Sequence, residues 1–202
     1  MSLYDYFRSR AMTCDVHNKS AEKIIIGQAS RSEADWKFNN TVKCLFPPNT
    51  ACVVGDMVTA NGSNFFITAM YKSADSTIEG KMIRSNASID IVRPTEQYND
   101  AGSMIGYTEV AIVTGEPTVY EAVTGKMQQF DAGLLSGTIA KFYLPFPGVY
   151  VDSFVSFTTV YGNVVQLLDR IKLNNVNYCI DAMNTASTPG MVLLQCSQDK
   201  RK

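Results

Sequence analysis

The chain has 202 residues, of which 46% are hydrophobic and 18% charged, the composition of an ordinary globular protein with a real core. Its net charge is −1, and neither half has an excess of lysine and arginine. This balance excludes the strongly basic surface typical of nucleic-acid binders. The length allows one large domain or two small ones, each able to bury a core without disulfides.

The N-terminal sequence predicts a protein that is not exported. Residues 1–6 lack the apolar run and cleavage pattern of a signal peptide, and no stretch approaches the ~20 apolar residues that cross a bilayer. We therefore expect a cytoplasmic protein with free, buried thiols. The odd number of cysteines leaves two pairings open, Cys44 with Cys52 and Cys179 with Cys196.

Residues 1–23 differ from the rest of the chain and predict an N-terminal arm. Leu3 and Phe7 fall on one face of a short helix that we expect within residues 3–12. A short arm cannot bury its aromatic residues (Tyr4, Tyr6 and Phe7) by itself. We therefore expect the arm to dock on its own domain or on a neighbouring subunit.

Residues 24–94 predict a first domain of antiparallel strands. Asn61-Gly62 lies between two apolar runs and is the strongest two-residue hairpin signal, because both positions of that tight turn need φ > 0. The strands expected here lie at 24–26, 57–60, 65–68, 81–84 and 89–92. Trp36 is either an anchor for a partner or a plug for its own barrel.

Residues 95–104 are polar and turn-forming, and they follow a proline at position 94, so they predict a linker. Residues 105–202 then predict a second mostly β domain. Its expected strands lie at 109–113, 138–144 and 153–157. The last of these alternates apolar and polar residues, as a half-buried strand does.

An internal repeat connects the two predicted domains. Residues 56–70 align with 169–183 without a gap, and six of the pairs are identical. The identical pairs are Asp56/Asp169, Asn61/Asn174, Asn64/Asn177, Ile67/Ile180, Ala69/Ala182 and Met70/Met183. Upstream, residues 41–47 resemble 138–145, and downstream we align 81–84 with 191–194. A tandem duplication explains the order, the spacing and the turn together, and it predicts two small antiparallel barrels or sandwiches.

No motif of catalysis, cofactor binding or metal binding stands out, so we predict no site residues of these kinds. The single histidine, His17, has no orienting partner nearby in the sequence, and no phosphate-binding glycine loop or Cys-x-x-Cys motif occurs. The matched Asp56 and Asp169 are interpreted as turn caps at strand starts. One alternative remains open: a β-barrel binding module or hydrolase with dispersed carboxylates such as Asp56, Asp169 and Asp181.

The segment from Gly55 to Asn86 resembles the head-closure and head–tail joining proteins of tailed bacteriophages. The resemblance rests on two runs: Gly55-Asp56-x-Val58-x-x-Asn61-Gly62-x-x-Phe65-x-Ile67-Thr68, and Gly80 to Asn86. It covers residues 1–93. Members of this family have a short N-terminal helical segment before a small β-barrel.

The resemblance implies a virion structural protein, not an enzyme, that forms a homo-oligomeric ring of six or twelve subunits between the portal and the tail. A protruding β-loop of such a ring can plug the DNA channel, and DNA passes without sequence recognition. The expected partners are portal, adaptor and tail proteins, first in the host cytoplasm and then in the virion. A tail terminator, tube or baseplate hub protein is the structural alternative, since three two-domain chains can mimic a hexamer.

Overall fold

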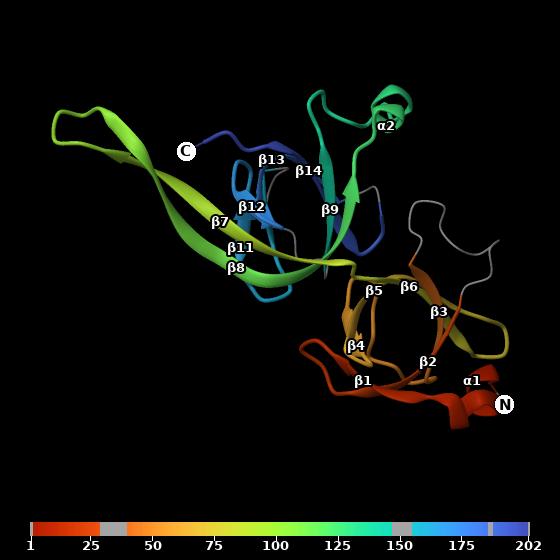
Figure 1. Cartoon of the computed structure of the whole chain (residues 1–202). Helices are drawn as coiled ribbons and strands as arrows, with labels where there is room; N and C mark the ends of the chain where they lie inside the picture. The colour runs from red at the N-terminus through yellow and green to blue at the C-terminus, as the bar shows by residue number, and fades with distance from the viewer. Residues whose placement is uncertain (1, 29–39, 147–154, 186–187, 202) are drawn as a thin grey trace. The chain divides into compact units, whose positions relative to one another are not determined.

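Antiparallel strands form most of the regular structure in the computed structural model, which describes residues 2–28, 40–146, 155–185 and 188–201 (Figure 1). The first part of the chain forms α1 (Leu3–Phe7), a 3-10 turn (Arg8–Arg10), β1 (Met12–Val16), β2 (Glu22–Gln28), β3 (Thr41–Phe46), β4 (Met57–Ala60), β5 (Ser63–Lys72) and β6 (Ile78–Arg84). The second part forms β7 (Ala87–Tyr98), β8 (Met104–Ala122), α2 (Gly125–Phe130), β9 (Ala140–Pro145), β10 (Ser156–Thr158), β11 (Val164–Gln166), β12 (Arg170–Leu173), β13 (Val176–Asn184) and β14 (Met191–Gln198).

All of these strands except β10 and β11, which form a separate two-stranded sheet, close into two barrels that share one topology. This confirms the predicted mostly β fold of two tandem barrels. The strand order is β1-β2-β3-β6-β5-β4 in the first barrel and β7-β8-β9-β14-β13-β12 in the second. Each barrel therefore contains two three-stranded meanders joined at both ends. Closure pairs every barrel strand on both sides, so that neither sheet has a free edge along its closed part.

The repeat predicted from the sequence is visible in the backbone. Asn61 and Gly62 have φ values of 49° and 70°, and Asn174 and Asn175 have values of 50° and 63°. Both pairs thus occupy the left-handed region that a two-residue hairpin turn requires. The strand after each turn also carries a bulge at the same place, between Ile67 and Ala69 in β5 and between Ile180 and Ala182 in β13.

The downstream part of the predicted alignment was wrong by four residues. Phe65 pairs with Arg84 in the first barrel, and its counterpart Tyr178 pairs with Gln198 in the second. Residues 81–84 are therefore equivalent to 195–198, not to 191–194. The apolar run of β14 lies at residues 191–194, whereas the equivalent residues 195–198 are mostly polar, so a match by hydrophobicity chose the wrong register.

The predicted domain boundaries need correction. The chain divides into one unit of Met1–Ser85, Pro145–Gly148 and Thr185–Met191 and a second of Asn86–Leu144, Val149–Asn184 and Val192–Lys202. The predicted linker at 95–104 does not exist: it consists of the end of β7, a turn and the start of β8. Pro94 does not end its strand, because β7 has no neighbour on one side there and loses no ladder bond.

The N-terminal arm is shorter than predicted. β1 pairs with both β2 and β4, so the region from Met12 belongs to the first barrel, and only α1 and the 3-10 turn precede it. The arm docks on its own unit: Tyr4 is buried, and its hydroxyl donates a 2.6 Å hydrogen bond to the Lys23 carbonyl. Tyr6 remains 74% exposed.

Candidate functional site

Each barrel contains a buried aspartate turn that precedes the hairpin of the repeat. The Asp56 side chain accepts a 2.7 Å hydrogen bond from the Val53 amide, and its backbone carbonyl accepts one from the Ile67 amide. Asp169 accepts a 2.8 Å bond from the Gln166 amide and is bonded in the same way to Ile180. This geometry agrees with the interpretation of the two residues as turn caps. Each carboxylate accepts a hydrogen bond from a backbone amide of its own unit.

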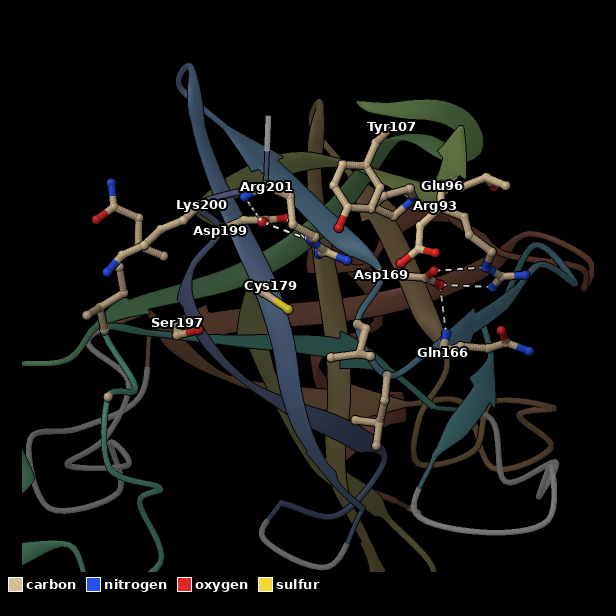
Figure 2. Close-up of a pocket in the computed structure, with 17 residues that line it drawn as sticks. Arg93, Glu96, Tyr107, Gln166, Asp169, Cys179, Ser197, Asp199, Lys200 and Arg201 are labelled. Atoms are coloured by element: carbon tan, nitrogen blue, oxygen red, sulfur yellow. Dashed lines mark hydrogen bonds and ion pairs between the residues drawn. The ribbon is translucent and has the colours of Figure 1, made fainter. Parts of the chain in front are cut away.

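In the second barrel this turn borders a groove. Arg93 of β7 forms a two-pronged ion pair with Asp169, with both N···O distances 2.9 Å (Figure 2). Arg93 also donates a hydrogen bond to the Val164 carbonyl. The hydrogen bond to Asp169 raises the pKa of Arg93. The first barrel has a simpler pair, in which the Lys19 ammonium lies 2.5 Å from Asp56.

A second buried carboxylate, Asp199, anchors the opposite wall of the groove. Arg170 donates to it from Nε at 2.7 Å, and Arg201 adds a further ion pair at 2.6 Å. Burial alone would raise the pKa of Asp199, but hydrogen bonds from these two guanidinium groups hold it below its usual value. Arg170 and Lys172 also both pair with Glu109 of β8, which connects the cluster to the base of the β7–β8 hairpin.

The groove has a volume of about 1320 Å³ and lies entirely within the second unit. Within its ion pairs the arginines are more exposed than the carboxylates that they bind, and Glu96 adds an exposed carboxylate to the lining. The side chains of Asp169 and Asp199 are only 3% and 2% exposed, whereas those of Arg93 and Arg201 are 33% and 23% exposed. Lys200 also lines the groove. A ligand in the groove would therefore meet the arginines, Lys200 and Glu96 before it met either buried carboxylate.

Leu168, which also lines the groove, combines a left-handed backbone with an exposed side chain. It has φ = 68° and is 61% exposed, although a leucine in the left-handed region costs about 1–2 kcal/mol. Its counterpart in the first barrel is Gly55, with φ = 95°. A Cβ on Gly55 would lie 2.3 Å from the Phe146 carbonyl oxygen, so glycine is required there. Leu168 is strained without gaining burial in its own chain, which marks it as a candidate contact residue.

The β7–β8 hairpin extends well beyond the second barrel, as the yellow-green pair of strands in Figure 1 shows. β7 pairs with β12 only over Asp90–Val92, and β8 pairs with β9 only over Val119–Ala122. Beyond Val92 the two strands pair, among the described residues, only with each other, out to Tyr98 and Met104. The corresponding β1–β2 connection in the first barrel is a short loop between Val16 and Glu22.

Glu116 is a buried carboxylate without a hydrogen-bond partner among the described residues. It lies in β8 and is only 1% exposed. Burial raises its pKa to about 7. Both carboxylate oxygens thus lack the compensation that a buried charge needs, and the protonated form is favoured at mildly acidic pH.

The three carboxylates of the hydrolase alternative lie on different structural elements. Asp56 and Asp169 cap turns in different units, and Asp181 lies at the bulge of β13. Among the described residues, no three histidine, cysteine or acidic side chains come together as a metal site. All five cysteines are free; Cys179 is half-buried and the other four are buried. Trp36 lies outside the described residues.

Sequence reasoning missed the hairpin and the groove. One signal for the hairpin was available: the run from Pro94 to Gly125 contains no lysine, arginine or histidine. Leu168 left no signal, because its left-handed conformation follows from the aspartate turn and not from a turn-type residue. In the part of the chain that the structure describes, no helix has the length and apolar character to span a membrane.

Comparisons with known proteins provide no family for this chain. No protein-family model matches it, and no curated protein is significantly similar to it.

Proposed function

We propose that this chain is a structural protein of a tailed-phage virion that assembles into a ring in the neck, between portal and tail. The observation that supports this most directly is the contrast between its two barrels. They share a closed topology, but one of them extends a long hairpin whose outer part, beyond Val92, pairs with no other strand of the described chain. Such a ribbon is marginal in water, so it needs a partner surface.

The use of the charged groups supports a non-catalytic role. In the groove, Asp169 and Asp199 are each bound by arginine, and Asp169 also accepts a backbone amide. A general base or nucleophile needs a free lone pair facing a substrate. These carboxylates instead hold strands and turns together, which is the work of a rigid building block.

Charge also supports passive passage of DNA. A ring that lets DNA slide must not hold phosphates with dense lysine and arginine, and the chain has a net charge of −1. The extended hairpin has acidic residues and no basic one between Pro94 and Gly125. A loop of this charge beside a DNA channel would repel the backbone and leave the DNA mobile.

The repeat also supports a tail terminator, tube or hub protein as a second candidate. Two barrels of identical topology allow three chains to present six equivalent barrels, which matches the sixfold symmetry of a tail with a threefold ring. The number of subunits distinguishes the two proposals, because six or twelve favours the neck and three favours the tail.

The test is a nonsense mutation in the gene for this chain in a phage that encodes it, with particles examined by negative-stain electron microscopy. The neck proposal predicts separate heads and complete tails, and heads that have lost DNA. A suppressor strain that restores the chain serves as the control and should restore joined particles. Normal, infectious virions in the absence of the chain would contradict a structural role, and heads with tails of abnormal length would favour the tail alternative.

A further inference from the structure

The tip of the β7–β8 hairpin exposes apolar side chains that nothing in the described chain covers. Tyr98 is 58% exposed, Met104 46% and Ile105 64%. Asp100 lies at the same end, and no lysine, arginine or histidine occurs between Pro94 and Gly125. The tip is therefore both apolar and anionic.

The tip is also held in one shape. Asn99 accepts hydrogen bonds at its side-chain oxygen from the amides of Ala101 (3.1 Å) and Ser103 (2.8 Å). Its backbone amide donates to the Ser103 carbonyl at 2.9 Å, and Gly102 supplies the left-handed residue (φ = 75°) that the turn needs. A preorganised loop loses little conformational entropy on binding.

The groove offers the complementary surface. Its guanidinium groups lie outside their buried carboxylates, Lys200 adds a further cation, and Leu168 provides an exposed apolar side chain in a strained conformation. Because Glu96 and Tyr107 are the outermost hairpin residues that line the groove, Asp100 at the tip lies four residues further along the same hairpin. At ~3.3 Å per residue this is about 13 Å away, so that Asp100 does not reach its own groove.

We propose that the hairpin tip of one copy binds the groove of the next copy, which joins chains head to tail. This inference rests on the proposed ring, and it names the contact that builds it. The tip would place Ile105 and Tyr98 against Leu168, and Asp100 near Lys200 and the two arginines. A contact between two different surfaces of identical chains forms a ring when its rotation closes and a filament when it does not.

The test uses two variants of the full chain and sedimentation velocity. The tip variant, Asp100→Lys with Ile105→Ser, keeps the groove intact. The groove variant, Leu168→Asp with Lys200→Glu, keeps the tip intact, and aspartate is accepted at a left-handed position better than leucine. The matched control, Lys126→Glu with Phe130→Asp, makes the same kinds of change on α2, where Phe130 is 77% exposed.

We expect the wild-type chain and the α2 control to assemble, and the tip and groove variants each to remain monomeric. An equimolar mixture of the two variants should form a dimer and nothing larger, since one intact tip then meets one intact groove. Formation of that dimer also shows that both variants are folded.

Other results would overturn the inference in distinguishable ways. If the wild type assembles and either variant does so as well, or if the mixture forms no dimer, the contact is wrong while the ring stands. If the wild type is a monomer at every concentration, both the contact and the proposed ring are wrong.

Discussion

The two barrels of this chain differ at one strained backbone position and in the length of one strand connection. In the first, Gly55 is fixed by a close approach to the Phe146 carbonyl, and the loop after β1 is short. In the second, the equivalent residue is an exposed leucine, and the equivalent connection is a long hairpin. The comparison teaches that both copies keep one scaffold, while the second copy adds an exposed leucine and a long hairpin that the first copy lacks.

The largest expected effect concerns the buried ion pairs, which differ between the barrels. Asp199→Ala should lower the free energy of unfolding by about 3–5 kcal/mol, because it leaves the 6%-exposed Arg170 without its main partner. Asp56→Ala should cost less, about 1–3 kcal/mol, because Lys19 is 27% exposed and can return to water. Urea unfolding followed by circular dichroism measures both. An equal or reversed order would contradict this view of the two barrels.

The next effect is a dependence of the free energy of unfolding on pH, which we expect from Glu116 in the second barrel. The folded pKa of Glu116, about 7, lies above its ordinary value of 4.5, so the folded state binds this proton more tightly. The stability that it contributes is therefore complete below pH 4.5 and is lost as pH rises through 7. The loss amounts to about 3 kcal/mol.

Urea unfolding at a series of pH values from 4.5 to 8 measures this loss. Glu116→Gln cannot titrate and serves as the control, so its stability should change less over this range than that of the wild type. The same slope in both proteins would rule out Glu116 as the source.

Substitutions at the equivalent positions 55 and 168 should change the stability by smaller amounts and in opposite directions. Gly55→Ala should destabilise by about 2 kcal/mol or more, because the new Cβ meets a carbonyl oxygen and the residue stays left-handed. Leu168→Gly should leave stability unchanged or raise it by up to about 1 kcal/mol, since glycine removes the strain. Thermal unfolding of both variants measures the difference. A clear loss in Leu168→Gly would show that this leucine serves its own barrel.

The smallest effect concerns the two matched hairpin turns. Asn175→Gly would give the second barrel the Asn-Gly turn of the first and should stabilise by about 0.5 kcal/mol, because φ is 63° at this position. The reverse change, Gly62→Asn, should destabilise by a similar amount. If thermal unfolding shows the same sign for both changes, the two turns are not equivalent.

The repeat could be predicted from the sequence because it lies where burial imposes a pattern. The Asn61-Gly62 turn, the flanking strands and the paired Asp56 and Asp169 all belong to closed parts of the barrels, where side chains alternate between core and surface. β1 was also readable, since Cys14 and Val16 are buried and alternate with exposed residues. Its assignment to the arm overlooked that alternation.

The hairpin could not be read in this way. Neither face of residues 94–110 is covered by a third layer, so no apolar period developed, and the segment has the composition of a linker. The groove depends on register and not on local sequence, because it brings Arg93, Asp169 and Arg201 together from distant parts of the chain. The residues that we propose for the interface are therefore the ones that local sequence patterns did not predict.

The mass of the particle that the purified wild-type chain forms tests the central claim most directly. Sedimentation velocity over a range of concentrations should show one discrete species whose mass is a whole-number multiple of 22.3 kDa, with three, six or twelve subunits. A discrete ring would support a structural building block and would fix its symmetry. A monomer at all concentrations, also in the presence of the portal protein, would contradict the account.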